Sequence, residues 1–119
     1  MKYLVIILLI FIAFLQSCYY DKAFIDENSI CDTAIVTYSS SVNPILTAYC
    51  TGCHSGANAP LGIMLDNYTG VKAEVTANKL LAVITHAPGV SPMPKNGNKL
   101  NDCNIAKIRI WIAAGAPNN

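Results

Sequence analysis

The sequence predicts a small, mostly helical domain with long loops. Apolar residues recur with a helical period in three separate segments, and no stretch alternates apolar and polar residues over a useful strand length. Residues 86–99 contain three prolines and two glycines, which disfavours regular structure there. A domain of roughly 80 ordered residues with this much loop buries a thin core, so we expect another group to fill its centre.

The N-terminus has the pattern of an export signal. Met1 and Lys2 form a short basic start, and residues 3–15 form an almost unbroken apolar run. As a helix this run would rise only about 20 Å, which is too short for a hydrocarbon core of roughly 30 Å. We therefore expect a cleaved signal rather than a retained membrane anchor.

The four residues that follow, Leu15-Gln16-Ser17-Cys18, resemble the lipobox of bacterial lipoproteins, although Gln16 is not the commonest residue at its position. The resemblance implies a signal peptide over residues 1–17 and a lipid on Cys18, which would anchor the chain to a lipid bilayer. Residues 18–37 would then be the lipidated N-terminus and tether, and residues 38–119 the folded domain. The alternative is an ordinary secretory signal in which Cys18 is incidental.

The charge of the exported chain is balanced. Without Lys2, seven of the eight basic residues remain beside seven acidic residues. A nucleic-acid partner would require a basic stripe, and the sequence has none.

The first expected helix lies just before residue 50. Its apolar stripe follows i, i+3, i+4, i+7 spacing and consists of Val42, Ile45, Leu46 and Tyr49. Ser41 or Asn43 can cap this helix, and Pro44 falls in its first turn, where a missing N–H costs little.

Two short helices are expected within residues 66–86, with a break near Asn78. The apolar face of the first consists of Tyr68, Val71 and Val75. The face of the second consists of Leu80, Leu81 and Ile84.

The last expected helix has the clearest boundaries. Asn101 can cap it, and Leu100 and Ile105 are placed as a hydrophobic staple. Gly115 and Pro117 end it. Its buried stripe consists of Ile105, Ile108, Trp111 and Ile112.

The five cysteines divide into three groups. If Cys18 takes a lipid and Cys50 acts together with Cys53, then Cys31 and Cys103 remain, and thiols of exported proteins tend to pair. Their disulfide would stabilise the fold by roughly 4 kcal/mol in the chain-entropy model, and by less in practice. Two separately buried thiols are the alternative.

The stretch Cys50-Thr51-Gly52-Cys53-His54 has several possible interpretations. A zinc site needs about four ligands, and no second pair has matching spacing. A thioredoxin-like pair follows a strand, whereas a helix is expected here. A simple disulfide between the two cysteines leaves the histidine unexplained. Covalent haem accounts for all three residues, because two thiols add to the vinyl groups and the adjacent histidine ligates the iron.

Residues 36–119 resemble the class I monohaem cytochromes c in their compact bacterial form, and the planctomycete-type cytochrome c domains. The resemblance is carried by "VNPILTAYC" leading into "CTGCH", by "PMP" downstream, and by a final helix ending "WIAAGAPNN". It implies an all-helical wrap around one covalently bound haem c.

Met93 is the expected distal iron ligand. It lies between Pro92 and Pro94, which make its loop stiff, and a thioether suits low-spin iron. His86 is the alternative ligand, although its place at a helix end also suits contact with the last carbonyls. Met64 is the weaker methionine candidate. The resemblance further implies that the Pro60 carbonyl accepts a hydrogen bond from His54.

The expected function is one-electron transfer between redox proteins at a bacterial membrane. The protein would be an exported lipoprotein facing the periplasm or the outer surface, and an electron carrier rather than an enzyme, although it could serve a larger oxidoreductase. Two alternatives stay open. Met93 could be labile, which would give a haem-based ligand binder or a peroxidase-like accessory. The chain could instead be a disulfide-stapled lipoprotein without haem.

Overall fold

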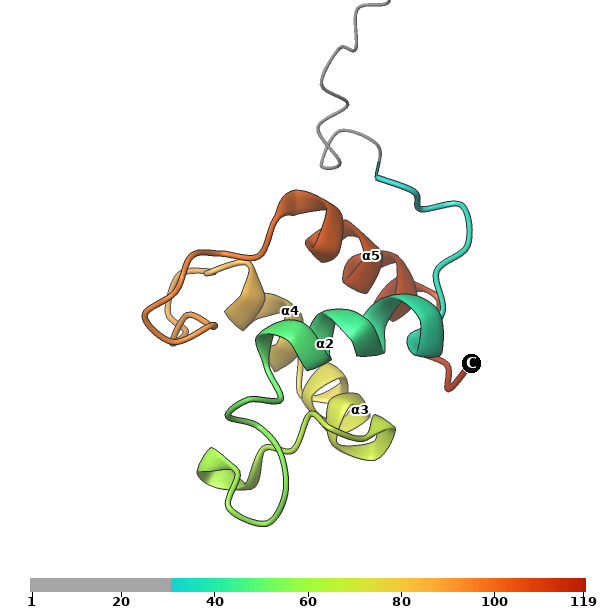
Figure 1. Cartoon of the computed structure of the whole chain (residues 1–119). Helices are drawn as coiled ribbons and strands as arrows, with labels where there is room; N and C mark the ends of the chain where they lie inside the picture. The colour runs from blue at the N-terminus through green and yellow to red at the C-terminus, as the bar shows by residue number, and fades with distance from the viewer. Residues whose placement is uncertain (1–30) are drawn as a thin grey trace, which may run out of the picture. The chain divides into compact units, whose positions relative to one another are not determined.

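Helices are the only regular structure in residues 31–119, which are the residues that the computed structural model describes (Figure 1). The predicted all-helical fold class is confirmed for this part of the chain. The elements are η1 (Tyr38–Val42, a π-helix), α2 (Asn43–Tyr49), η2 (Pro60–Gly62, a 3₁₀ helix), α3 (Tyr68–Thr76), α4 (Lys79–Ile84) and α5 (Asp102–Ala113). None of these helices is long and apolar enough to cross a bilayer.

The expected signal peptide, Cys18 and most of the expected tether lie outside the described residues and stay predictions. The compact unit runs from Cys31 to Asn119. Its first residues, which the sequence assigned to the tether, therefore belong with the helices.

The first helical stretch begins earlier than expected. Thr37 caps η1 by accepting from the Ser40 N–H at 3.1 Å, and η1 continues directly into α2. The prediction of a cap at Ser41 or Asn43 is wrong, because both residues lie inside the helical stretch. Three residues of the expected stripe are buried: Val42, Ile45 and Leu46. Tyr49, at the end of α2, is 48% exposed instead.

The break between α3 and α4 falls at Asn78, as predicted. Asn78 has a φ of 56°, a left-handed conformation that asparagine tolerates better than most residues. Asn67 caps α3 by accepting from the Gly70 N–H at 2.9 Å. The expected faces point inward: Val71, Leu80 and Ile84 are buried, and Tyr68, Val75 and Leu81 are partly buried against them.

Helix α5 follows its prediction closely. Asn101 accepts from the Asn104 N–H at 2.8 Å, and Leu100 and Ile105 are both buried. Gly115 follows the helix with a φ of 90°. The buried face is Ile105, Ile108 and Trp111, with Ile112 partly buried beside them.

Trp111 is the centre of the core. Its side chain is fully buried, and its ring centroid lies 5.5 Å from that of Tyr38, which also meets Tyr68 edge-on at 5.2 Å. The Trp111 Nε1–H donates to the Pro117 carbonyl at 2.8 Å, so its polar atom is satisfied. Trp111 therefore packs in the core with no unsatisfied polar atom.

Helix α5 packs against η1 and α4 (Figure 1). The chain end reinforces this contact, because the backbone N–H groups of Tyr38 and Ser39 donate to the side chain and the carbonyl of Asn119 at 2.8 and 2.9 Å. The two long loops, residues 50–66 and 85–101, both lie on the left of the domain in Figure 1.

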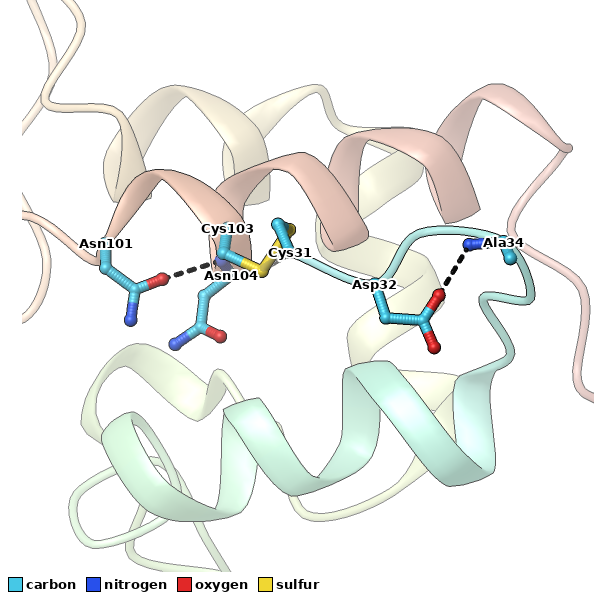
Figure 2. The surroundings of a disulfide bond; sticks show 6 residues. All are labelled: Cys31, Asp32, Ala34, Asn101, Cys103 and Asn104. Carbon is cyan, nitrogen blue, oxygen red and sulfur yellow. Dashed lines mark hydrogen bonds between the residues drawn. A yellow bond between two sulfur atoms is a disulfide. The ribbon is translucent and has the colours of Figure 1, made fainter. Parts of the chain in front are cut away.

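The predicted disulfide between Cys31 and Cys103 is confirmed (Figure 2). Cys103 lies in the first turn of α5, beside the Asn101 cap, and Cys31 begins the described chain. The bridge joins residues 72 positions apart, with their Cα atoms 5.4 Å from one another. It fixes the start of the compact unit to the last helix, and the alternative of two separate thiols is wrong.

Gly70 marks a close approach between α3 and the preceding loop. A Cβ atom at this position would overlap the carbonyl oxygen of Met64. Although alanine suits a helix better than glycine by roughly 1 kcal/mol, we expect Gly70→Ala to lower the free energy of unfolding by about 1–3 kcal/mol through overpacking. Urea unfolding measures the change. The control is Ala73→Gly on the exposed side of α3, which should cost about 1 kcal/mol. Stabilisation by Gly70→Ala would contradict the prediction.

Candidate functional site

The two long loops and helix α4 enclose one cavity of about 640 Å³, within the range of roughly 300–1,000 Å³ that cofactor sites occupy. Its walls are almost wholly apolar. They include Tyr49, Leu61, Ile63, Leu65, Leu80, Val83 and Ile84. Cys50, Cys53, His54, Pro60 and Met93 line the same cavity. The structure thus brings together five of the residues that the sequence singled out.

The segment from Cys50 to His54 forms a single turn at the end of α2. The Cys50 N–H donates to the Leu46 carbonyl at 2.8 Å, so the first cysteine is held by the helix. The N–H groups of Cys53 and His54 then donate to the Cys50 carbonyl at 3.1 and 2.9 Å. This turn brings residues three and four positions apart to one side, as a helical turn does, so both thiols and the imidazole meet the cavity.

Both cysteines of the turn are free thiols. Burial raises the pKa of the Cys50 thiol to about 11. Redox-active C-x-x-C pairs have a lowered thiol pKa, so this environment disfavours a thioredoxin-like function. Residues 31–119 contain no group of three or more His, Cys, Asp or Glu side chains that could hold a metal ion.

His54 is oriented by a backbone carbonyl. Its Nδ1 lies 3.1 Å from the carbonyl oxygen of Ile63, and since a carbonyl can only accept, Nδ1 carries the proton. In the neutral imidazole, Nε2 then keeps its lone pair and can bind a metal. The role expected for the Pro60 carbonyl is therefore taken by Ile63, three residues later, while Pro60 lines the cavity wall.

The loop after His54 is closed at its base. The Leu65 N–H donates to the His54 carbonyl at 2.8 Å, and the Gly56 N–H donates to Asp66 Oδ2 at 2.8 Å. The Gly56 N–H, and after it the Asn67 side chain, lower the pKa of the Asp66 carboxyl. These contacts hold residues 54–66 as one loop, which keeps the Ile63 carbonyl beside His54.

Met93 reaches the cavity from the other long loop. Its N–H donates to the Val83 carbonyl at 3.0 Å, and its carbonyl accepts from His86 Nε2 at 3.1 Å. His86, the alternative ligand, is not among the residues that line the cavity. Met64, the weaker candidate, is 40% exposed and also lies outside the lining.

Charged side chains are few at this cavity. Glu74, Lys79 and Lys95 are the charged residues of its lining. A group held here would therefore be surrounded mainly by apolar side chains.

No protein-family model, no curated protein and no solved structure matches this chain. The residues of the cavity are therefore the basis for assigning a function. They fit haem c: two free thiols in one turn, a histidine whose Nδ1 is hydrogen-bonded to a carbonyl and whose Nε2 has no hydrogen bond within residues 31–119, a methionine, and apolar walls.

Three functional positions were missed at the sequence level. The carbonyls of Ile63 and Val83 hold the two expected iron ligands, but every residue has a carbonyl, so side-chain identity gives no signal for them. Lys79 is the first residue of α4 and lines the cavity. Its place there depends on how α4 packs, which the sequence does not show.

Proposed function

We propose that this chain binds one haem c covalently and carries single electrons between redox proteins at a bacterial membrane. One observation carries the proposal: Cys50, Cys53, His54 and Met93 come from two loops far apart in the sequence, yet all line the same apolar cavity. Apolar surroundings of this kind suit a porphyrin, and these four side chains are those that attach and ligate one.

Each residue has a separate task. Cys50 and Cys53 would form the thioether bonds, His54 would ligate through Nε2, and Met93 through its thioether sulfur. Bound haem supplies the exchange of one electron between ferrous and ferric iron. By filling both axial positions, His54 and Met93 would leave no position for oxygen or peroxide, which favours electron transfer over catalysis.

The location of the protein is part of the proposal. A Cys31–Cys103 disulfide is typical of an exported protein, since disulfides persist in oxidising compartments. Export through residues 1–17 and a lipid on Cys18 would keep the carrier at a membrane surface, near its redox partners.

The visible spectrum of the full-length chain, expressed with a haem-attachment system, tests the proposal. We expect a low-spin haem spectrum that stays with the polypeptide after acid–acetone extraction, because thioether bonds survive that treatment. We also expect no carbon monoxide binding by the reduced protein at neutral pH.

Other results would contradict the proposal in different ways. Haem that extracts into acetone, or never binds, would favour the stapled lipoprotein without haem. Covalent haem that binds carbon monoxide would favour the ligand binder in which Met93 is labile.

A further inference from the structure

His86 occupies a position that glycine commonly holds. It follows Thr85, the C-cap of α4, and has a left-handed φ of 55°. The His86 N–H donates to the Val83 carbonyl at 3.3 Å. The Ala87 N–H donates to the Ala82 carbonyl at 3.0 Å, which completes a Schellman motif. Glycine adopts this conformation at the least cost, so the turn by itself does not account for a histidine at this position. The contacts of the imidazole side chain do.

The side chain of His86 reaches the loop that carries Met93. Its Nε2 lies 3.1 Å from the Met93 carbonyl oxygen, and because a carbonyl can only accept, Nε2–H is the donor. The Met93 N–H donates to the Val83 carbonyl at 3.0 Å. Both backbone polar groups of Met93 are thus held by residues at the end of α4.

These two hydrogen bonds are the links between the Met93 loop and the helices. The other hydrogen bonds formed by residues 90–97 stay within the loop: Val90 N–H to the Ala87 carbonyl, Gly97 N–H to the Pro94 carbonyl, and Lys95 Nζ to Ser91 Oγ. Most of this loop is exposed, whereas Met93 and His86 are half-buried. The His86 bond therefore restrains a segment that has few other contacts to hold it.

We propose that His86 is a positioning residue, whose imidazole holds the Met93 backbone so that the thioether stays at the cavity. His86 does not line the cavity and acts through Met93. The inference rests on the proposed function, because it takes Met93 as an iron ligand. It differs from the expectation of a second histidine ligand, since the Nε2 of His86 carries a proton and bonds a carbonyl.

Three substitutions separate the hydrogen bond from the backbone conformation. His86→Gln keeps an N–H donor at about the reach of Nε2. His86→Leu keeps the size of the side chain and removes the donor. His86→Asn suits the left-handed conformation, but its amide is too short to take the place of Nε2.

Imidazole added to the ferric, haem-loaded full-length chain measures how firmly Met93 is bound, because it competes for the same axial position. In His86→Leu and His86→Asn we expect the half-saturating imidazole concentration to fall about tenfold, which is the effect of losing one hydrogen bond of about 1.4 kcal/mol. The weak sulfur-to-iron absorption band should weaken in parallel. His86→Gln should stay within about twofold of the wild type. Met93→Ala gives the reference for a lost ligand.

His86→Asn is the decisive variant, because asparagine keeps the left-handed turn. If His86 served only that turn, the imidazole affinity of His86→Asn would equal that of the wild type. Urea unfolding should show it at least as stable as His86→Leu, which loses the same hydrogen bond and suits the left-handed conformation less well, while its imidazole affinity rises as much. Wild-type affinity and a full sulfur band in both His86→Asn and His86→Leu would overturn the inference and leave the proposed function intact. Absence of covalent haem from the wild type would overturn both.

Discussion

Replacing Cys50 and Cys53 together by alanine is expected to reduce covalently bound haem to background. Both thiols face the cavity from one turn, and no other free cysteine lies in the described residues 31–119. Without them no thioether bond can form, and acid–acetone should extract any haem that the cavity retains. A haem-stained denaturing gel of the full-length chain measures the loss directly.

Single variants and a neighbouring control sharpen this result. Cys50→Ala and Cys53→Ala each leave one thioether, so acid-stable haem should persist at reduced yield. The absorption should move to longer wavelength, because the unreacted vinyl group stays conjugated with the porphyrin. Thr51→Ala lies between the cysteines, and its hydroxyl bonds only the Thr47 carbonyl at 3.1 Å, so it should keep full attachment. Acid-stable haem in the double variant would contradict the role assigned to both thiols.

Helix α5 shows what the sequence could establish about the fold. Asn101 supplies the cap, an apolar residue recurs every third or fourth position, and Gly115 follows the end, so local signals agree along the whole element. The start of η1 shows the opposite case. The run Ser39 to Ser41 carries no apolar period, yet Thr37 caps a helix there, and the Tyr38 N–H beside the cap donates to the side chain of Asn119. That contact joins residues 81 positions apart, and local pattern cannot reveal it.

The candidate site divides in the same way. The sequence predicted the side chains that line the cavity with a thiol, an imidazole or a thioether, because few residue types carry these groups. Their supports were missed, because Ile63 and Val83 act through backbone carbonyls. Tyr49 was expected in the core from its helical spacing, but α2 ends beside the cavity and leaves it half exposed. Helical periodicity predicts which residues share one side of a helix. It does not show that the last of them, here Tyr49, lies beyond the packed core.

Replacing Cys31 and Cys103 together by serine is expected to lower the free energy of unfolding by about 2–4 kcal/mol. The bridge spans 72 positions and encloses every element from η1 to α4. Its removal releases the unfolded chain over that whole length, which is where a disulfide has most of its effect in the chain-entropy model. Urea unfolding of the haem-loaded chain measures the difference.

The haem of the proposed function makes this prediction sharper. Thioethers at Cys50 and Cys53 attach the porphyrin to one turn and close no large loop, so they cannot replace the bridge in the unfolded chain. Wild-type protein and the double serine variant should therefore have the same free energy of unfolding when both are under reducing conditions, since both then lack the covalent link and both hold ferrous iron. The denaturant dependence of the free energy should rise slightly in both, because an unfolded chain without the bridge exposes more surface. A loss below about 1 kcal/mol would mean that iron ligation by His54 and Met93 persists in the unfolded chain and closes much of the same loop.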